Sequence, residues 1–508
     1  MARIVVIGAG MGGMASAARL RVKGHDVTLV EAAPGHGGRV GALHHEGFTF
    51  DTGPSVFTLP AVYRDLFLKT GTALEDSVEL VELEPGFEHR FGTTSLTLPG
   101  AGVGRCAVAV GEALGARSED EWRALMAHAA EVWSHLRRGV LEVPVAGPRD
   151  LTELARDRSA RRALAPWQSL RQLGRRHLSD PRARQLLDHY ALGAGSDPRR
   201  TPGTQVLAPY IEATFGLWHI GGGVHRLADA LRARLDERRV TVRMGTRATR
   251  IMVTGGKVSA VEVTPSEATS GRHSEPRELL PADVVVATAH AGQVYGALLG
   301  PQTPRLAARR LRASRPGLST FSLHLAVRGR TPDLRHHTVW HGEDPDLQVR
   351  TLFARHPQPP SDPTIHACVP DDPAQCPPGH EAWTLQVSVP RHGQGRPGPG
   401  TFDWSASGVA TNYADLLLDR LAQRGTDLRE RVLWRAIRTP ADIEHDTTAP
   451  GGSSYGVAPT TPRAVLGRAS NASPLPGLFL VGDSAHPGSG LPLVGMGAEI
   501  VADLIGRA

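Results

Sequence analysis

Three glycines near the start of the chain have the spacing of a nucleotide-binding turn. Gly8, Gly10 and Gly13 follow the apolar run at residues 3–7, and Glu31 closes a second apolar run. In a strand–turn–helix–strand unit, such glycines permit a tight turn, close approach of the backbone to a pyrophosphate and close packing of helix on sheet, while the acid binds ribose hydroxyls. The free N–H groups of the helix then face the diphosphate. The pattern predicts a bound dinucleotide, and the alternative is a glycine-rich turn without a ligand.

Three further segments indicate which dinucleotide is bound. Gly38 and Arg39 end a Gly-Gly-Arg segment shortly after Glu31, residues 51–55 read DTGPS, and residues 478–483 read LFLVGD. These segments resemble the amine-oxidase and phytoene-desaturase superfamily of flavoproteins. In that superfamily a GGR segment follows the ribose acid, a D-x-G segment passes the flavin, and an aspartate after the last strand bonds the ribityl chain. The resemblance implies bound FAD.

The expected FAD ligands come from both ends and from the middle of the chain. They are Gly8, Gly10, Met11, Gly12, Gly13, Glu31, Gly38, Arg39, Gly53, Pro54, Ser55, Ala248, Gly482, Asp483, Leu493 and Val494.

The carboxyl-terminal segment narrows the resemblance. Residues 481–492 (VGDSAHPGSGLP) are similar to the signature of the bacterial carotenoid desaturases, although Leu493-Val494-Gly495 stands where phytoene enzymes usually continue with glycine. The resemblance implies that C=C bonds are introduced next to a polyene by hydride transfer to flavin N5 and loss of a proton, in a phytoene-type or hydroxycarotenoid 3,4-desaturation. The alternatives are a carotene cis-trans isomerase, another flavin oxidase of the superfamily, and a non-catalytic flavin-containing partner of a pigment assembly.

Three residues are candidate proton acceptors. His486 lies in the segment expected to face the flavin, and His219 and Glu212 lie near the glycine triplet at residues 221–223. Each can take up a proton. The alternative is that all three have structural roles.

No metal site is expected. The pairs His44-His45 and His336-His337 lack ligand spacing with other residues, and the three cysteines form no metal-ligand pattern. So few cysteines in 508 residues also argue against a disulfide framework and favour a reducing, cytoplasmic location.

Positive charge is concentrated in one region. Residues 149–200 contain 12 arginines against 6 acids, interleaved with leucines at helical spacings, whereas the net charge of the whole chain is +6. A basic amphipathic helical region is typical of proteins that lie on an anionic membrane surface. The alternative is an ordinary solvated helical domain. No nucleic-acid-binding motif accompanies the charge, and no apolar run reaches the roughly 18 residues of a spanning helix.

The order of segments predicts an α/β flavoprotein of the two-dinucleotide-binding-domain (Rossmann) type. We expect a discontinuous FAD-binding domain, a mixed-sheet substrate domain and a helical lid that faces the membrane. The expected limits are 1–75, 218–290 and 463–508 for the first, 76–105, 206–217 and 291–462 for the second, and 106–205 for the third.

Overall fold

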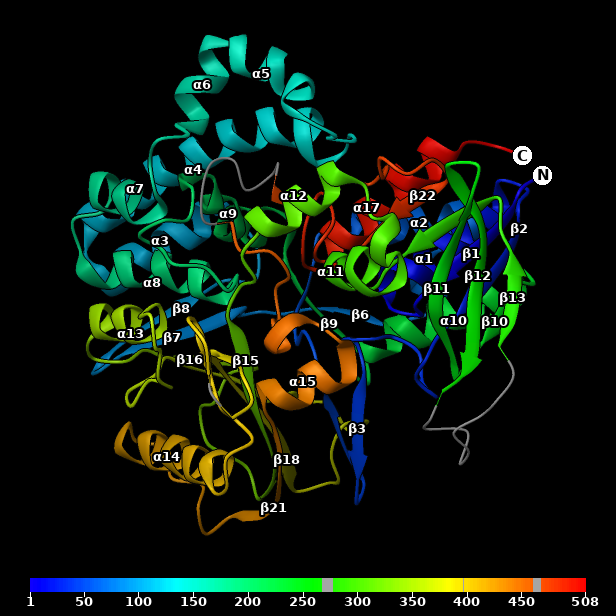
Figure 1. Ribbon diagram of the computed structural model, residues 1–508. Helices are drawn as coiled ribbons and strands as arrows, with labels where there is room; N and C mark the ends of the chain where they lie inside the picture. The colour runs from blue at the N-terminus through cyan, green and yellow to red at the C-terminus, as the bar shows by residue number, and fades with distance from the viewer. Residues whose placement is uncertain (267–276, 396, 460–466) are drawn as a thin grey trace.

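The computed structural model describes residues 1–266, 277–395, 397–459 and 467–508 as an α/β protein (Figure 1). The ribbon contains a parallel sheet that includes strands from both ends of the chain, a larger mixed sheet, and a group of helices above the mixed sheet. The expected boundary between residues 462 and 463 lies outside the described residues.

The parallel sheet has the strand order β10-β2-β1-β14-β22. Its strands are β1 (Arg3–Ile7), β2 (Asp26–Val30), β10 (Thr241–Arg243), β14 (Val284–Ala287) and β22 (Leu478–Leu480). The two apolar runs of the nucleotide motif thus form β1 and β2, as predicted. Because β14 pairs with both β1 and β22, the first and last strands of the chain are separated by a single strand.

Both faces of this sheet are covered, which explains why its strands are apolar throughout. Ile4 and Val6 of β1 pack in a core with the helices α1 (Met11–Val22), α2 (Ala61–Thr70), α10 (His225–Glu237) and α17 (Leu491–Ile505). Val5 and Ile7 point to the opposite face, toward a three-stranded antiparallel sheet of β11 (Thr246–Thr254), β12 (Lys257–Pro265) and β13 (Glu278–Pro281). β11 and β12 form a hairpin around Gly255-Gly256.

The mixed sheet has the order β21-β15-β18-β17-β16-β7-β8. Its strands are β7 (Phe87–Phe91), β8 (Thr94–Leu98), β15 (Ser319–Arg328), β16 (His337–Trp340), β17 (Ile365–Cys368), β18 (His380–Val389) and β21 (Val432–Arg438). The remaining strands form small sheets: β3 (Ala42–His45) with β4 (Phe48–Asp51), β19 (Arg391–His392) with β20 (Thr401–Phe402), and β9 (Leu217–Ile220) between β5 (Phe57–Thr58) and β6 (Leu80–Glu82).

The two faces of the mixed sheet differ in chemistry. Phe321, Leu323 and Leu325 of β15 pack in one core with Leu417 and Leu421 of α14 (Val409–Gln423). The alternate residues of the same strands are polar and point to the opposite face. They include Thr320, Ser322 and His324 on β15, Thr384, Gln386 and Ser388 on β18, and His366 and Cys368 on β17.

The helical region consists of seven helices on top of the mixed sheet (Figure 1). They are α3 (Val103–Leu114), α4 (Ala116–Leu136), α5 (Thr152–Arg156), α6 (Arg158–Leu164), α7 (Leu170–His177), α8 (Pro181–Gly193) and α9 (Leu207–Phe215). Trp122, Leu125, Met126 and Ala129 are buried, so one apolar face of α4 packs on the core of the helical region. Among the described residues, no helix combines the length and the apolar character needed to cross a membrane.

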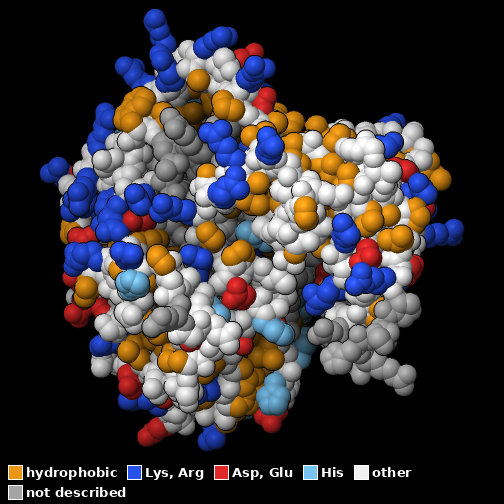
Figure 2. All heavy atoms as spheres, in the orientation of Figure 1, with side chains coloured by type: hydrophobic (Ala, Val, Ile, Leu, Met, Phe, Trp, Pro, Cys, Tyr) orange, Lys and Arg blue, Asp and Glu red, His pale blue; other side chains and the backbone are white. Residues whose placement is uncertain are grey.

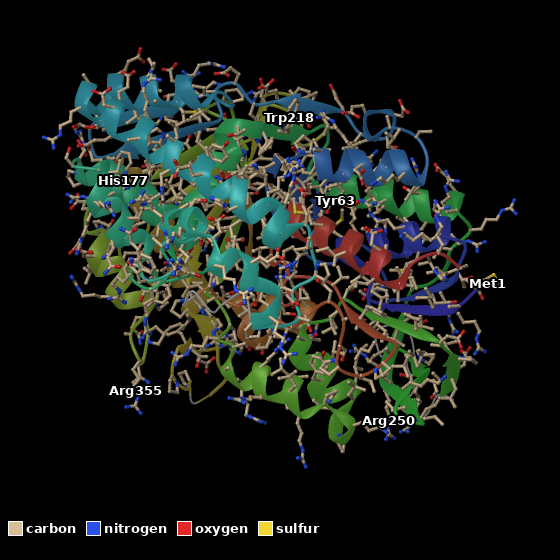
Figure 3. The ribbon with its side chains drawn as sticks, turned by 90° about the horizontal axis from the view of Figure 1, so that it is seen from above. Met1, Tyr63, His177, Trp218, Arg250 and Arg355 are labelled. Carbon is tan, nitrogen blue, oxygen red and sulfur yellow. The ribbon has the colours of Figure 1, made fainter. Side chains whose placement is uncertain are left out.

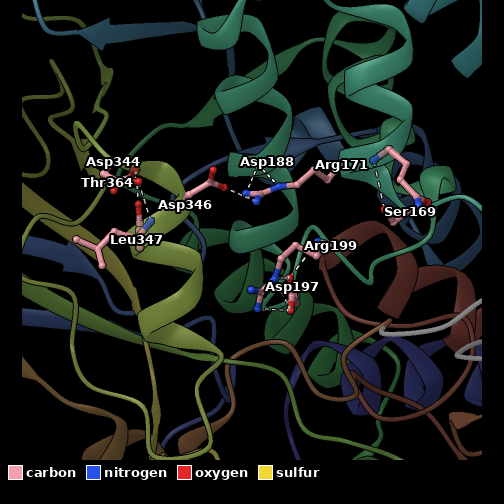
Figure 4. A network of polar contacts seen from close by, with 11 residues as sticks. Ser169, Arg171, Asp188, Asp197, Arg199, Asp344, Asp346, Leu347 and Thr364 are labelled. Carbon is pink, nitrogen blue, oxygen red and sulfur yellow. Dashed lines mark hydrogen bonds and ion pairs between the residues drawn. The ribbon is translucent and has the colours of Figure 1, made fainter.

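An ionic network joins the helical region to a helix that lies between strands β16 and β17 in the chain (Figure 4). The Arg171 guanidinium, on α7, donates to Asp188 on α8 at 2.9 Å and also pairs with Asp346 of α13 (Pro345–Leu352). Three short helices lie in the connections between the two large sheets. They are α11 (Ala291–Gln293) and α12 (Arg305–Ala313), between β14 and β15, and α15 (Pro440–Thr447), between β21 and β22.

Candidate cofactor crevice and active site

The first glycine turn leaves the amino terminus of α1 open. The helix begins after Gly10, which provides no side-chain cap, and a Cβ added at Gly10 would meet no atom within 4 Å. At Gly13, by contrast, a Cβ would collide with the carbonyl oxygen of Gly8. The sequence therefore brings the helix close to the strand end and leaves its first N–H groups facing free space, which is the arrangement that binds a diphosphate.

Glu31 is held beside this turn. Its two carboxylate oxygens accept the N–H groups of Ala9 at 2.7 Å and of Ala33 at 2.8 Å. Ala248 lies on β11 and packs against the core that contains Val30, the residue before Glu31. Both predicted residues thus border the carboxyl end of β2, where the ribose of a dinucleotide is expected.

The Gly-Gly-Arg segment joins the two ends of the chain. A Cβ at Gly38 would lie 3.1 Å from the Cα of Gly10, so only glycine permits this close approach. The Arg39 guanidinium forms an ion pair with Asp483 at 2.6 Å. It also donates to the backbone carbonyl groups of Ser454 at 2.7 Å and Ser453 at 2.8 Å.

The carboxyl-terminal turn lies against the first one. A Cβ at Gly12 would lie 2.9 Å from Val481 and 3.0 Å from Val494. Seen from above, α17 passes Tyr63 (Figure 3), whose hydroxyl donates to the carbonyl of Leu491 at 3.2 Å. The two glycine turns thus lie side by side, and Met11, Gly482 and Asp483 belong to this junction, where the flavoprotein resemblance leads us to expect FAD.

Leu493 lies apart from the glycine turns. Although it is on the first turn of α17, it packs with Leu59, Trp133 and Met496 against the helical region.

A cavity of about 330 Å³ lies next to the junction of the two glycine turns. Its wall begins at Pro54 and Ser55, directly after Gly53, whose carbonyl oxygen accepts the Gln386 amide at 3.1 Å. The exposed surface of the wall is mainly apolar, with polar side chains set into it. They include Thr320, Gln386, Ser388 and His366 from the polar face of the mixed sheet, His89 from β7, and His189, Tyr190 and Glu212 from the helices.

Glu212 is the candidate base that the structure places in this cavity. The Tyr190 hydroxyl donates to its carboxylate at 2.7 Å. Burial raises the pKa of Glu212 to about 7, against the opposing effect of the Tyr190 hydrogen bond. Burial lowers the pKa of His189 to about 4 and that of His366 to about 3, so both histidines are neutral near pH 7. Among these four side chains, Glu212 is the one that titrates near neutrality.

The other two candidate bases lie outside the cavity wall. His486 is 2% exposed, and its Nε2 donates to the carbonyl groups of Val140 at 2.8 Å and Val143 at 3.0 Å. His219 is paired through Nε2 with the Asp372 carboxylate at 2.9 Å. These contacts favour the structural alternative for both histidines.

Sequence reasoning missed the histidines and the tyrosine of the cavity. His89 lies on β7, His189 and Tyr190 on α8, and His366 on β17, so no local motif joins all four. The available signal is the alternation of polar and apolar residues at 319–327 and 383–389, which indicates that one face of each strand meets a polar surface.

The glycine turn gives a first testable prediction. Gly13→Ala should reduce the FAD content of the purified protein at least tenfold, because the added Cβ pushes α1 away from the strand end. The flavin-to-protein absorbance ratio measures this. Gly35→Ala is the matched control, since a Cβ there meets nothing within 4 Å. Full FAD content in Gly13→Ala would contradict this account of the turn.

Comparisons with known proteins agree with this geometry. Residues 11–396 match the family model described as flavin containing amine oxidoreductase. The chain is 32% identical, over its whole length and 99% of the relative, to a hydroxyneurosporene desaturase of Cereibacter sphaeroides. It is 28% identical to a 4,4'-diapolycopene oxygenase of Methylomonas sp, covering 99% of this chain and 98% of the relative.

Solved structures show the same fold. An oxidoreductase from Methanosarcina mazei superposes with a TM-score of 0.65 at 17% identity, covering 99% of this chain and 100% of the other. A putrescine oxidase bound to putrescine gives a TM-score of 0.65 at 15% identity, with 99% of both chains covered. With most of its length matched by the family model, the chain belongs to the flavin containing amine oxidoreductases, and its cofactor is FAD.

Proposed function

We propose that the protein is a carotenoid desaturase whose substrate carries an oxygen function near the bond that is oxidised, as in a hydroxycarotenoid 3,4-desaturation. The observation that carries the proposal is the set of polar side chains in the otherwise apolar wall of the cavity beside Gly53, Pro54 and Ser55. The names of the relatives, which include hydroxyneurosporene desaturases and phytoene desaturases, support the substrate class.

We expect the residues of the two glycine turns, with Glu31, Gly38, Arg39 and Gly53, to hold FAD. Gly10, Met11, Gly12 and Gly13 would face the pyrophosphate, and Glu31 the adenosine ribose. Gly38, Arg39, Gly53, Gly482, Asp483 and Val494 would border the flavin half of the molecule. Bound FAD supplies the hydride acceptor.

The wall of the cavity favours an oxygenated substrate over a plain hydrocarbon. Polar groups that face a hydrocarbon lose their hydrogen bonds to water, which costs about 1–3 kcal/mol for each group. Gln386, Ser388 and Thr320 stand on neighbouring strands of the polar face and line the same cavity. Gln386 and Ser388 already donate to the carbonyl groups of Gly53 and Leu192. A hydroxyl group on the substrate would donate to the oxygen atoms of these side chains, which a methyl group cannot do.

Glu212 would accept the proton that desaturation releases. Its carboxylate lines the cavity together with Pro54 and Ser55, and the Tyr190 hydroxyl fixes one of its oxygens. A base with a pKa near the working pH is suited to this step, because it is ionised in a useful fraction and still binds a proton well.

The products formed in a pigment-producing host without its own desaturases test the proposed function. Expression should convert hydroxylated carotenoids into products two hydrogens lighter that absorb at longer wavelength, and should leave the matching hydrocarbons largely unchanged. Chromatography with mass and absorption spectra measures both. Products of unchanged mass would indicate an isomerase, added oxygen would indicate an oxygenase, and either result would overturn the proposal.

The pH dependence of turnover tests the role of Glu212. Because the base acts as a carboxylate and its pKa is about 7, kcat should fall about tenfold per pH unit below pH 7. Glu212→Gln should lower kcat by about 10²–10⁴-fold and remove this inflection. Tyr190→Phe should move the inflection to higher pH, since it removes a hydrogen bond to the carboxylate.

Glu88→Gln is the matched control for this experiment. Glu88 is 8% exposed and pairs with Arg90 and Ser95 outside the cavity, so its replacement should leave the pH profile unchanged. A Glu212→Gln protein with the full rate and the same inflection would exclude Glu212 as the base.

We also propose that the protein is cytoplasmic and binds an anionic membrane surface through its helical region. The three cysteines are free and buried, which suits a reducing compartment. A groove of about 680 Å³ between α4, α6 and α7 is lined by Arg158, Arg161, Arg162 and Arg176, none of which forms an ion pair within the described part of the chain. Trp167 lies at its rim, 74% exposed.

The surface view supports this assignment. Lys and Arg side chains crowd the top of the molecule, where α5 and α6 project (Figure 2). Unpaired guanidinium groups beside an exposed tryptophan match the phosphate and interfacial layers of a bilayer.

Flotation with lipid vesicles tests the membrane proposal. Wild-type protein should float with vesicles that contain phosphatidylglycerol and not with neutral ones. Arg161→Glu with Arg162→Glu should weaken binding about 30-fold, at about 1 kcal/mol for each arginine lost. The same reversal at Arg247 and Arg250, which are exposed on β11 away from the groove, should have little effect. Equal binding by both double variants would overturn the assignment.

A further inference from the structure

A second group of chemically active side chains lies in the mixed sheet, beside the cavity. His337 begins β16 and Cys368 ends β17, and the two residues are directly opposed in the antiparallel register. His336 precedes His337. One ligand atom from each of these three residues lies within 4.8 Å of the other two. The sequence predicts no metal at the His336-His337 pair, because the third donor comes from a neighbouring strand, which spacing along the chain does not indicate.

Two of the donor atoms in this group have no hydrogen-bond partner among the described residues. They are Nε2 of His336 and Nε2 of His337, and both are buried. The His337 side chain is 0% exposed, and Cys368 is a buried free thiol. A buried polar atom without a partner costs about 1–3 kcal/mol. Two such nitrogens beside one thiol are therefore expensive unless something binds them.

We propose that His336, His337 and Cys368 bind one Zn²⁺ ion. Two imidazole nitrogens and one sulfur are a ligand set that zinc prefers over magnesium or calcium, which take oxygen ligands. Ligands of a tetrahedral zinc ion lie about 3.4 Å apart, so rotation of the side chains must bring the donors roughly 1 Å closer. The fourth position is left for a water molecule.

The surroundings fit the second shell of a zinc site. Nδ1 of His337 lies 3.1 Å from Nε2 of His366. If Nδ1–H donates to His366, Nε2 of His337 carries the lone pair that an ion needs, and such a partner for the second ring nitrogen is usual for zinc-bound histidines. The ring of His219 lies 4.8 Å from that of His336, and its Asp372 partner supplies negative charge close to the site.

The ion would act on the active site through His366. His366 lines the cavity, and the bond from His337 fixes which of its ring nitrogens accepts and which donates. His336, His337 and Cys368 are thus positioning residues for the cavity wall, outside the wall itself. Zinc binding at these three residues does not depend on which substrate the enzyme oxidises.

Metal analysis of the full-length, FAD-loaded protein tests the proposal. Plasma mass spectrometry of protein purified without an affinity tag should find about one zinc per chain. Cys368→Ala and His337→Gln should each lower this at least tenfold. Cys106→Ala and His324→Gln should keep it, since Cys106 is a buried free cysteine on α3 and His324 a buried histidine on β15. The FAD content of each variant reports whether it folds.

A measurement on the wild type covers the case in which a variant does not fold. X-ray absorption at the zinc edge should show one sulfur and at least two nitrogen or oxygen neighbours. Protein that contains no zinc after purification, and none after incubation with Zn²⁺ and gel filtration, would overturn the proposal. So would zinc that the Cys368→Ala variant retains. Neither result depends on substrate, so failure of the zinc proposal would leave the proposed function to be tested by its own product analysis.

Discussion

The ion pair between Arg39 and Asp483 is the contact on which the rest of the site depends. It joins residues near the two ends of the chain at 2.6 Å, and the side chains are 28% and 18% exposed. The same guanidinium donates to two backbone carbonyl groups at Ser453 and Ser454, so three distant segments converge on one side chain. Without Asp483, Arg39 would keep these two backbone partners, whereas without Arg39 the partly desolvated Asp483 carboxylate would lose its ion pair. The two glycine turns meet because β14 brings the two ends of the chain together and Arg39 holds them.

The second constraint is the difference in chemistry between the two buried faces of the mixed sheet. One face packs on α14 and supplies a conventional core, while the other face buries polar residues next to the cavity. A buried polar face is stable only where its groups are hydrogen-bonded. His324 is paired with Thr384 at 3.2 Å, His89 with His341 at 3.1 Å, and Gln386 with Gly53. Of these side chains, His89 and Gln386 also line the cavity, so their bonds fix part of its wall.

The parts that could be predicted from the sequence are those with local signals. Glycine turns and apolar runs are properties of neighbouring residues, and they predicted β1, α1 and β2. The cavity wall and the pairing of His337 with Cys368 depend on strand order and register, which no local pattern encodes. Glu212 was found because it lies near the glycine triplet at residues 221–223, but its partner Tyr190 comes from a different helix and was missed.

The position of Glu212 sets a condition on how the helical region can behave. Glu212, the base that we propose, lies on α9 and its partner Tyr190 on α8, whereas Ser55 and Gln386 approach the cavity from other parts of the chain. A helical region that moved away from the sheet would take Glu212 with it. The Arg171 guanidinium opposes such motion, because it is 13% exposed and bridges Asp188 of α8 to Asp346 of α13. The region that we propose to meet the membrane is therefore a fixed wall of the active site, and a long substrate must thread past it.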